Sequence, residues 1–293
     1  MLDKVIMNKY GFYTLKEPPS DKEREDYYKN KYYQGVFRGF TIKYTAQELE
    51  FFKAKLEQKL LLIKQHYAPH ENISFIDIGC GEGFAVKFFK DNGFSVLGLD
   101  YSEAGIKNHN SDILDNTIIG DVYESINNLI SKEKSFNIVN MDNILEHVTD
   151  PFILLEKVYK LMTENGIAII KVPNDFSVLH KYFIENKIVS KPYWVAPLDH
   201  ISYFNKEGLI NICSSAGFEN LDILGNYMTE FFILNTNTNY YENPQVGKSC
   251  HLARVAQENI LHGISPEKSI ALYRILGEMG LGREIIGVFK KRS

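Results

Sequence analysis

The sequence predicts an α/β fold with an open, Rossmann-like sheet that is mostly parallel and has helices on both faces. From residue 74 onward, short apolar runs alternate with segments of helical periodicity. The first of these runs leads directly into a loop that contains Gly79, Gly81 and Gly83. Strands that alternate with helices form βαβ units, whose crossover helices cover the two faces of a parallel sheet.

Each element has its own signal in the sequence. A helix is expected over residues 43–67, where Leu49, Phe52 and Leu56 recur at spacings of three and four. Strands are expected at 74–79, 95–100, 116–121, 136–142, 166–172, 218–224 and 284–290, and helices at 151–162 and 206–215. A further helix begins at Pro266, with Ser265 as its N-cap.

Three stretches interrupt the alternation, and we interpret them as additions around the sheet. Residues 1–70 are expected to form an N-terminal helical segment that acts as a lid. Residues 71–293 form the main domain, with inserts at 173–204 and 226–282. The alternative is that these additions are only packing material without contact to a ligand.

Composition excludes several classes of function. The chain of 293 residues is 44% hydrophobic and has a net charge of −4, which gives no general attraction to nucleic acid or anionic lipid. Its cysteines, Cys80, Cys213 and Cys250, lie far apart, so neither a disulfide framework nor a zinc site is indicated. No segment approaches the ~18 apolar residues of a membrane span. We therefore expect a soluble, cytoplasmic protein.

The glycine loop is the strongest single motif. In Phe75-Ile-Asp-Ile-Gly-Cys-Gly-Glu-Gly83 an apolar strand runs into a loop where a ligand can approach the bare backbone. The spacing differs from the dinucleotide fingerprint, because Phe84 occupies the place of the third glycine. Glu82 would repel a pyrophosphate at this turn. The uncharged thioether–ribose region of S-adenosylmethionine would fit better.

Acidic residues follow at the ends of the next strands. Asp100 can accept hydrogen bonds from both hydroxyls of a ribose, and Asp121 could reach the exocyclic amine of adenine. A single aspartate at a strand end is more often a cap, but two beside a glycine loop favour a ligand. Asp77 lies within a buried strand, where a carboxylate needs a partner, such as the amino group of a methionine moiety.

These motifs, together with Asn143-Ile-Leu-Glu-His-Val-Thr-Asp-Pro151, resemble the class I S-adenosylmethionine-dependent methyltransferases. The resemblance covers residues 72–225 and 284–290. It is closest to the group with ubiquinone-biosynthesis O-methyltransferases and sugar methyltransferases of surface-polysaccharide pathways. It implies a sheet of seven strands with the last antiparallel, and it makes 71–293 the methyltransferase domain.

The resemblance also implies contacts to the cofactor S-adenosylmethionine. The methionine part would meet Gly79, Gly81 and Gly83, the ribose Asp100, and the adenine Asp121. The sulfonium would be bordered by Met141, Asp142 and Asn143, and Asp77, Cys80 and Tyr101 complete the expected cofactor contacts. Some quinone-type relatives have a Glu-x-x-Glu-His metal motif, but Asn143 occupies its first position here, so no metal is expected.

Two histidines are candidates for the base that removes a proton from the acceptor. His147 follows the fourth strand, and a structural role for it is equally possible. His200 lies in the 173–204 insert, in a position that resembles the segment that closes over the acceptor in related sugar methyltransferases. We favour His200, with Asp199 and Tyr203 as residues that orient the base or bind the acceptor.

The sequence favours a small-molecule methyltransferase over two alternatives. An NAD-dependent oxidoreductase conflicts with the glycine spacing, and a non-catalytic S-adenosylmethionine-binding protein conflicts with the intact motifs. For the acceptor site we predict Tyr32, Trp194 and Tyr203. The predicted reaction is O-methylation of a sugar or nucleotide-linked sugar in bacterial surface-polysaccharide biosynthesis, with a phenolic quinone precursor as the alternative. The 226–282 insert is a candidate dimer element.

Overall fold

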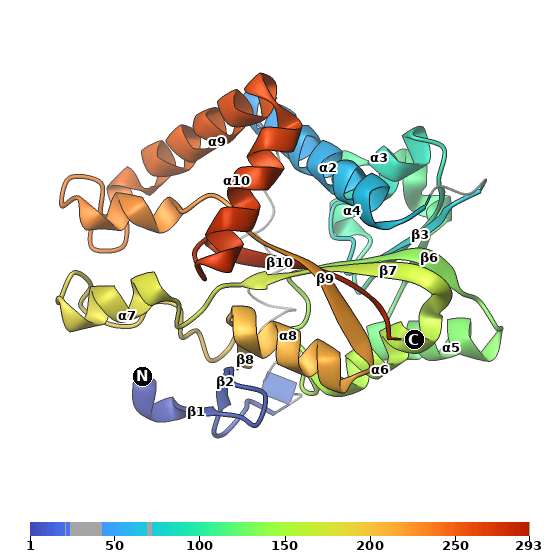
Figure 1. Cartoon of the computed structure of the whole chain (residues 1–293), viewed down its shortest axis with the longest axis horizontal. Helices are drawn as coiled ribbons and strands as arrows, with labels where there is room; N and C mark the ends of the chain where they lie inside the picture. Colours follow the sequence, from blue (N-terminus) through green and yellow to red (C-terminus); the bar gives the residue numbers. More distant parts are fainter. Residues whose placement is uncertain (21, 24–42, 69–71, 293) are drawn as a thin grey trace.

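The computed structural model describes residues 1–20, 22–23, 43–68 and 72–292. Its main sheet consists of β3 (Ser74–Ile78), β4 (Ser95–Asp100), β5 (Thr117–Ile119), β6 (Phe136–Asp142), β7 (Met162–Pro173), β9 (Phe218–Gly225) and β10 (Glu284–Lys291). Within the described residues this sheet has seven strands in the order β5-β4-β3-β6-β7-β10-β9. β10 is antiparallel to β7 and β9, and the other neighbouring pairs are parallel. The predicted fold class is confirmed (Figure 1).

The described part of the chain has nine α-helices, most of which lie on the two faces of this sheet. They are α2 (Ala46–His66), α3 (Phe84–Asp91), α4 (Ala104–His109), α5 (Val122–Ser131), α6 (Pro151–Leu161), α7 (Val178–Glu185), α8 (Lys206–Ser215), α9 (Gly247–Ile264) and α10 (Pro266–Glu278). One core layer joins α5, α6 and α8 to the sheet through residues such as Leu129, Leu155 and Ile212. The opposite layer joins α2, α3 and α10 to it through residues such as Ile63, Phe89 and Ile270.

Local signals set the starts of several helices as the sequence predicted. Asp150 accepts hydrogen bonds from the backbone N–H groups of Phe152 and Ile153, at 3.0 and 3.1 Å, and Pro151 is the first residue of α6. Ser265 caps α10 in the same way. Such caps satisfy N–H groups that have no partner inside the helix. No helix among the described residues is long and apolar enough to cross a membrane.

The N-terminal segment differs from the helical segment predicted for residues 1–70. α2 is present, but β1 (Val5–Met7) and β2 (Tyr13–Leu15) form an antiparallel hairpin before it. β2 also pairs with β8 (Ser202–Tyr203) from the 173–204 insert. Strands this short give no periodicity that could be recognised in the sequence, so the hairpin and its pairing were missed.

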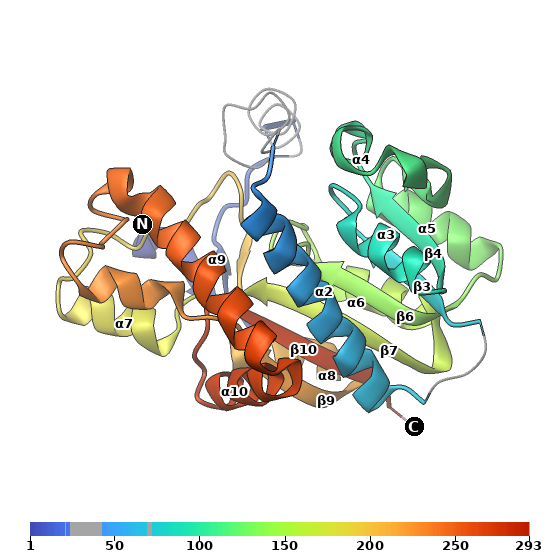
Figure 2. The same cartoon turned by 90° about the horizontal axis from the view of Figure 1, so that it is seen from above.

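Both inserts contain more regular structure than the sequence indicated. The first contains α7, and the second contains α9, where only α10 was expected. α9 lies beside α2 (Figure 2), and Lys55 of α2 forms a buried ion pair with Glu258 of α9. α9 has no side-chain cap hydrogen bond at its start. The cap signal that revealed α10 is therefore lacking at α9.

The two inserts pack against each other beside the sheet. Phe183 and Val189 of the first insert form an apolar cluster with Ile233 of η4 (Thr229–Leu234) in the second. The backbone N–H of Ser190 donates to the Glu242 carboxylate at 2.7 Å. The inserts therefore form one wall, which stands at the edge of the sheet where the parallel strands end.

Candidate functional site

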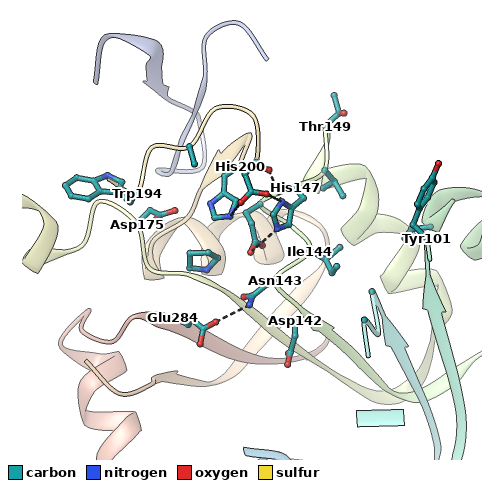
Figure 3. Close-up of a pocket in the computed structure, with 18 of the residues that line it drawn as sticks. Tyr101, Asp142, Asn143, Ile144, His147, Thr149, Asp175, Trp194, His200 and Glu284 are labelled. Carbon is teal, nitrogen blue, oxygen red and sulfur yellow. Dashed lines mark hydrogen bonds and ion pairs between the residues drawn. The ribbon is translucent and has the colours of Figure 1, made fainter. Parts of the chain in front are cut away.

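A cavity of about 1090 Å³ opens at the carboxyl ends of the parallel strands. Its glycine-loop end is lined by Gly79, Gly81, Asp100, Tyr101 and Asp121. Its insert end is lined by Asp175, His180, Trp194, Glu230 and Arg283. Figure 3 shows Tyr101 at one side, Trp194 at the other, and His147 and His200 between them. One continuous space therefore joins the glycine loop to the wall formed by the inserts.

The glycine loop has a backbone that only glycine adopts easily. Gly79 and Gly81 have φ values of +75° and +56°, in the left-handed region. A Cβ added at Gly79 would lie 2.0 Å from the Cδ1 atom of Ile144, whereas one added at Gly81 would meet no atom within 4 Å. Gly79 is thus needed for close packing, and the backbone at Gly81 is open for a ligand.

Asp100 and Asp121 are both held by backbone N–H groups. The Asp100 carboxylate accepts hydrogen bonds from the N–H of Gly81 at 2.7 Å and from the N–H of Ser102 at 2.9 Å. Burial nevertheless raises the pKa of Asp100 above its ordinary value. Asp121 caps α5 by accepting from the N–H of Glu124 at 2.9 Å. These bonds fix both side chains at the glycine-loop end.

A buried polar network lies behind the loop. Asn140 donates a hydrogen bond to Asp77 at 2.6 Å. Lys59 of α2 donates to Asn140 at 2.5 Å and to the carboxylate of Asp142 at 2.9 Å. Burial, followed by the charge of Asp142, raises the pKa of Asp77 to about 7. Lys59 thus ties α2 to the ends of β3 and β6, a link that the sequence analysis missed.

The turn after β6 contains a strained residue. Asn143 has a φ of +56°, a conformation that asparagine tolerates better than most residues. Its side-chain amide donates to the carboxylate of Glu284 at 3.1 Å. Lys171 lies 3.5 Å from Glu284 and 3.6 Å from Asp142. Burial opposes the charge of Glu284, but Lys171, Arg254, Arg283 and the Asn143 hydrogen bond together outweigh it and lower the Glu284 pKa to about 2.

His147 and His200 meet in the middle of the cavity, with ring centroids 4.8 Å apart. The Nδ1 atom of His147 lies 2.8 Å from the backbone carbonyl oxygen of Asp199, so this nitrogen is the donor. The hydroxyl of Tyr203 donates to the backbone carbonyl of His200 at 2.9 Å. Burial, followed by the charges of His147 and Arg283, lowers the pKa of His200 to about 3. His200 is therefore neutral near pH 7.

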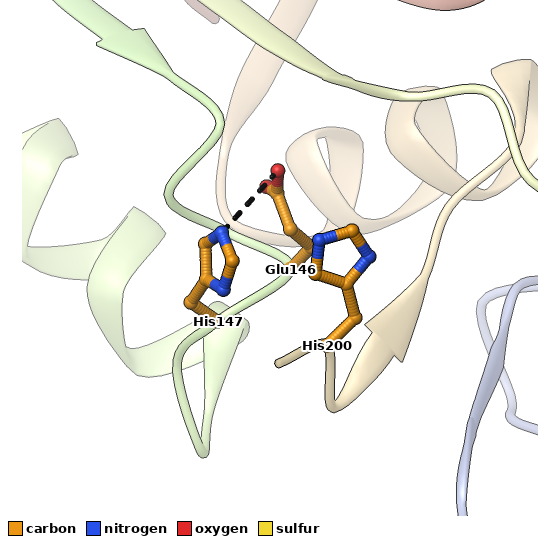
Figure 4. A group of neighbouring side chains, drawn as sticks. All are labelled: Glu146, His147 and His200. Carbon is orange, nitrogen blue, oxygen red and sulfur yellow. Dashed lines mark ion pairs between the residues drawn. The ribbon is translucent and has the colours of Figure 1, made fainter. Parts of the chain in front are cut away.

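Glu146 stands next to the histidines and is almost fully buried (Figure 4). Neither of its carboxyl oxygens has a hydrogen-bond partner among the described residues, and burial raises its pKa well above the ordinary value. One ligand atom each from Glu146, His147 and His200 lie within 4.8 Å of one another. The prediction of no metal rested on the cysteine spacing and on Asn143, and it did not anticipate that His200 would complete such a group.

The structure gathers most of the predicted site residues around the cavity. Among them, the lining includes Gly79, Gly81, Asp100, Tyr101, Asp121, Asn143, His147, Trp194 and His200. Met141 is fully buried in the core, because side chains alternate along β6, and its neighbour Asp142 faces the cavity instead. This placement corrects the prediction that Met141 borders the sulfonium.

Other predicted residues act from behind the cavity or lie elsewhere. Cys80 packs in an apolar cluster with Val86, and a Cβ at Gly83 would lie 2.6 Å from the Cδ1 atom of Ile113. Asp77 is buried, accepts a hydrogen bond from Asn140, and does not line the cavity. Tyr203 is fully buried and supports His200 through its carbonyl, so it does not line the space where we predicted it to bind acceptor. Tyr32 lies outside the described residues.

The insert end contains functional candidates that sequence reasoning missed. Asp175, His180 and Glu230 are all buried, and each has a polar atom with no partner in the part of the chain that the structure describes. Arg283 lies 3.1 Å from Glu230. These residues come from three separate segments, and no motif connects them. The only signal in the sequence was the polar and aromatic character of the inserts.

Comparisons with known proteins agree with this geometry. Residues 44–223 match the family described as "Methyltransferase domain". The chain is 30% identical over 112 residues to the ubiquinone biosynthesis O-methyltransferase of Pelagibacter ubique. The aligned region covers 38% of this chain and 47% of that protein. It is 24% identical over 152 residues to a probable S-adenosylmethionine-dependent methyltransferase of Mycolicibacterium smegmatis, covering 51% and 53%. The chain thus spans about half the length of these curated relatives.

A solved structure shows the same fold across most of the chain. The S-adenosylmethionine-dependent methyltransferase from Archaeoglobus fulgidus superposes with a TM-score of 0.51 at 20% sequence identity. The match covers 85% of this chain and 100% of that one. At this identity the likeness concerns the fold alone.

Proposed function

This chain belongs to the family of class I S-adenosylmethionine-dependent methyltransferases, and we propose that it methylates an oxygen atom of a sugar or nucleotide-linked sugar. One observation carries the proposal. A single cavity runs from the glycine loop, past His147 and His200, to a polar and aromatic wall formed by the inserts. A donor at one end and an acceptor at the other would meet beside the two histidines.

The glycine-loop end fits S-adenosylmethionine, the cofactor of this family. The open backbone at Gly81 leaves room for the methionine part, and the carboxylate of Asp100 offers an acceptor for ribose hydroxyls. Asp121 stands beyond it for the adenine amine. Asp142 and Asn143 line the cavity at the end of β6, where the proposal places the sulfonium. The bound cofactor supplies an electrophilic methyl group.

The chain must align the acceptor hydroxyl and accept its proton, and we assign this proton to His200. The ring of His200 lines the cavity and is neutral near pH 7, so a ring nitrogen is available to accept the proton, although burial makes it a weaker base than an ordinary histidine. His147 donates its Nδ1 proton to the backbone carbonyl of Asp199, which fixes its ring and leaves Nε2 as an acceptor, so His147 is the second candidate for the base. Tyr203 holds the backbone of His200 from behind.

Charge balance supports this assignment. A bound S-adenosylmethionine would retain the C–S bonding electrons while the acceptor oxygen forms the new C–O bond, which would neutralise its positively charged sulfur. The hydroxyl proton passes to His200 at the same time, so one positive charge disappears and one appears. The Asp199 carboxylate, 3.7 Å from Nε2 of His200, is placed to stabilise the imidazolium.

The insert end supports a hydroxyl-rich acceptor over a phenolic quinone precursor. Asp175, Trp194 and Glu230 each have a buried polar atom with no partner among the described side chains and backbone. Each such group left unpaired beside an apolar ligand would cost ~1–3 kcal/mol. A sugar can donate to or accept from these groups while its apolar face packs on an aromatic ring.

The proposal is tested by a binding measurement followed by an acceptor screen. Calorimetry would first measure S-adenosylhomocysteine binding to the wild-type protein. Methyl-labelled S-adenosylmethionine would then be offered with nucleoside diphosphate sugars, free sugars and a catechol, and methyl ethers detected by mass spectrometry. Transfer to a sugar is the expected result. Transfer only to the catechol would establish the phenolic alternative, and binding without any transfer would favour a non-catalytic protein.

A further inference from the structure

The insert end of the cavity holds one more buried carboxyl group than it has cations. Glu230 accepts a hydrogen bond from Arg283 at 3.1 Å. Asp175 is only 4% exposed, lines the cavity, and forms no ion pair with any described residue. Its Oδ2 atom has no hydrogen-bond partner within the described ranges. Asp175 is thus a buried acid without a counter-ion.

A carboxylate in such a position is costly. Burial raises the pKa of Asp175 well above its ordinary value, although Arg283 acts in the opposite direction. Burial also lowers the pKa of His180 to about 3, so His180 provides no positive charge near pH 7. The groups that face Asp175 therefore compensate its charge only in part, through Arg283, until a cationic ligand enters.

Aromatic rings surround the same space. Trp194 and Tyr193 both line the cavity, with ring centroids 5.2 Å apart and planes at 82°. The ring of His180 stacks on that of Trp194, with centroids 3.9 Å apart and planes at 3°. An aromatic wall beside a carboxylate is an arrangement that binds ammonium groups, because both attract positive charge.

We propose that the insert end recognises an amino sugar, with its protonated amino group paired to Asp175 and packed against Trp194. This inference rests on the proposed function and specifies its acceptor class. The unpartnered atoms Trp194 Nε1 and Glu230 Oε2 then bond to ring hydroxyls. The amino group is the anchor, and a hydroxyl elsewhere on the sugar lies toward His200 and receives the methyl group.

The proposal is tested with three matched probes: glucosamine, glucose and N-acetylglucosamine. Each is titrated by ligand-observed NMR into the protein saturated with S-adenosylhomocysteine. Glucosamine should bind about tenfold more tightly than the other two, the scale of one charge-assisted hydrogen bond. The Asp175→Asn variant should lose this preference, and Asp115→Asn, a substitution at an exposed residue of η3 (Ser111–Asn116), should retain it.

A pH series in the wild-type protein provides a second test that needs no substitution. The charged and titratable groups around Asp175 are Glu146, His180, Tyr193, Tyr203, Glu230 and Arg283. The preference for glucosamine should fall at alkaline pH, where its amine loses the proton, and at acidic pH, where Asp175 gains one. Binding of N-acetylglucosamine should show no such window.

Several outcomes would overturn the inference. They are equal binding of glucosamine and glucose, a preference that persists in Asp175→Asn, and no binding of any probe. These failures are distinguishable from failure of the proposed function. If S-adenosylhomocysteine still binds and a neutral sugar is methylated, only the amino-sugar inference falls. If S-adenosylhomocysteine does not bind, the methyltransferase assignment of the cavity falls first.

Discussion

At the glycine-loop end of the cavity, Asp100 accepts hydrogen bonds from the backbone N–H groups of Gly81 and Ser102, and Asp121 accepts one from the N–H of Glu124. At the insert end, Asp175, His180 and Trp194 each have a buried polar atom with no partner in the described parts of the chain. Buried polar groups in native proteins are nearly always paired, so unpaired ones require an explanation. The first end is complete before a ligand enters, and the second needs a ligand or water to complete it.

This difference indicates where the family chemistry and the specificity of this chain reside. A cofactor shared by many enzymes can be held by a prebuilt loop close to the sheet. The acceptor differs between enzymes. In this chain the proposed acceptor site is formed by the inserts, whose buried polar groups have no hydrogen-bond partner among the described residues. Predictions can therefore be aimed at each end separately, and at the histidines between them.

The largest expected effect comes from His200, where the two ends meet. His200→Ala should lower kcat about 10²–10⁴-fold, because proton removal by a positioned base contributes on this scale. Binding of S-adenosylhomocysteine should stay unchanged, because the ring does not belong to the glycine-loop end. Turnover with the acceptor found in the screen and calorimetric titration of the same variant would measure the two quantities.

A matched variant controls for the general loss of a histidine. His66→Ala removes a histidine of α2 that pairs with Asp222 at 2.9 Å, outside the cavity. Its turnover should remain near that of the wild type. If His200→Ala also retained near-wild-type turnover, His200 would not be the base, and His147 would become the next candidate.

The second prediction tests whether the glycine-loop end is as complete as its hydrogen bonds indicate. Asp100→Ala removes the acceptor for the N–H groups of Gly81 and Ser102, and the proposed partner of the ribose. S-adenosylhomocysteine binding should weaken by ~1.5–3 kcal/mol, the scale of hydrogen bonds to a charged group. Calorimetry would measure it, with Asp91→Ala on the exposed side of α3 as control. Unchanged affinity would remove Asp100 from the cofactor site.

The glycine-loop end of the cavity could be predicted from the sequence to a larger extent than the insert end. The residues of the glycine-loop end lie at strand ends within about forty residues of one another, so the local sequence pattern was enough to predict that they share one site. They are Gly79, Gly81, Asp100 and Asp121. Lys59 could not be found in this way, because only the packing of α2 on the sheet brings its amine to Asp142. The sheet itself was predictable because each strand and each cap has a local signal.

The insert end was beyond prediction for a related reason. Asp175, Glu230 and Arg283 come from three segments that meet only after the inserts pack on each other. The hairpin of β1 and β2 also escaped prediction, because its stability depends on pairing with β8 in a distant insert. Residues whose positions depend on long-range packing have no recognisable local sequence pattern. Their one signal in the sequence is that they are polar residues among apolar ones.

A third prediction concerns the stability cost of the unpaired groups at the insert end. The folded state holds the pKa of His180 at about 3, against an ordinary value of 6.5, so the unfolded chain binds this proton first as pH falls. The stabilisation is fully present above pH 6.5 and is lost as pH falls toward 3. Relative to His180→Phe, the wild-type free energy of unfolding should fall by roughly 1.4 kcal/mol per pH unit between about pH 6 and about pH 4.

Phenylalanine can retain the stacking on Trp194, whose ring centroid lies 3.9 Å from that of His180, without taking up a proton. Urea unfolding of both proteins at each pH would give the difference directly. Because Glu146 and Asp175 titrate in both proteins, their contributions largely cancel in this difference. Parallel stability curves for the two proteins would contradict the burial of an uncharged His180.

The smallest expected effect is that of chelation, and it tests the middle of the cavity. Glu146, His147 and His200 are close enough to hold a metal, but the positive charges of Lys171 and Arg283 act on Glu146 and His200, respectively. His147 donates its Nδ1 proton to the backbone carbonyl of Asp199, which leaves its Nε2 atom as the ligand atom for a metal. The expectation of no metal therefore rests on these two positive charges and on Asn143, which bonds to Glu284. We therefore expect dialysis against a chelator to leave kcat unchanged. Loss of activity that Zn²⁺ or Mg²⁺ restores, and that Glu146→Gln reproduces, would instead make His200 a ligand and transfer the activation of the hydroxyl to the metal.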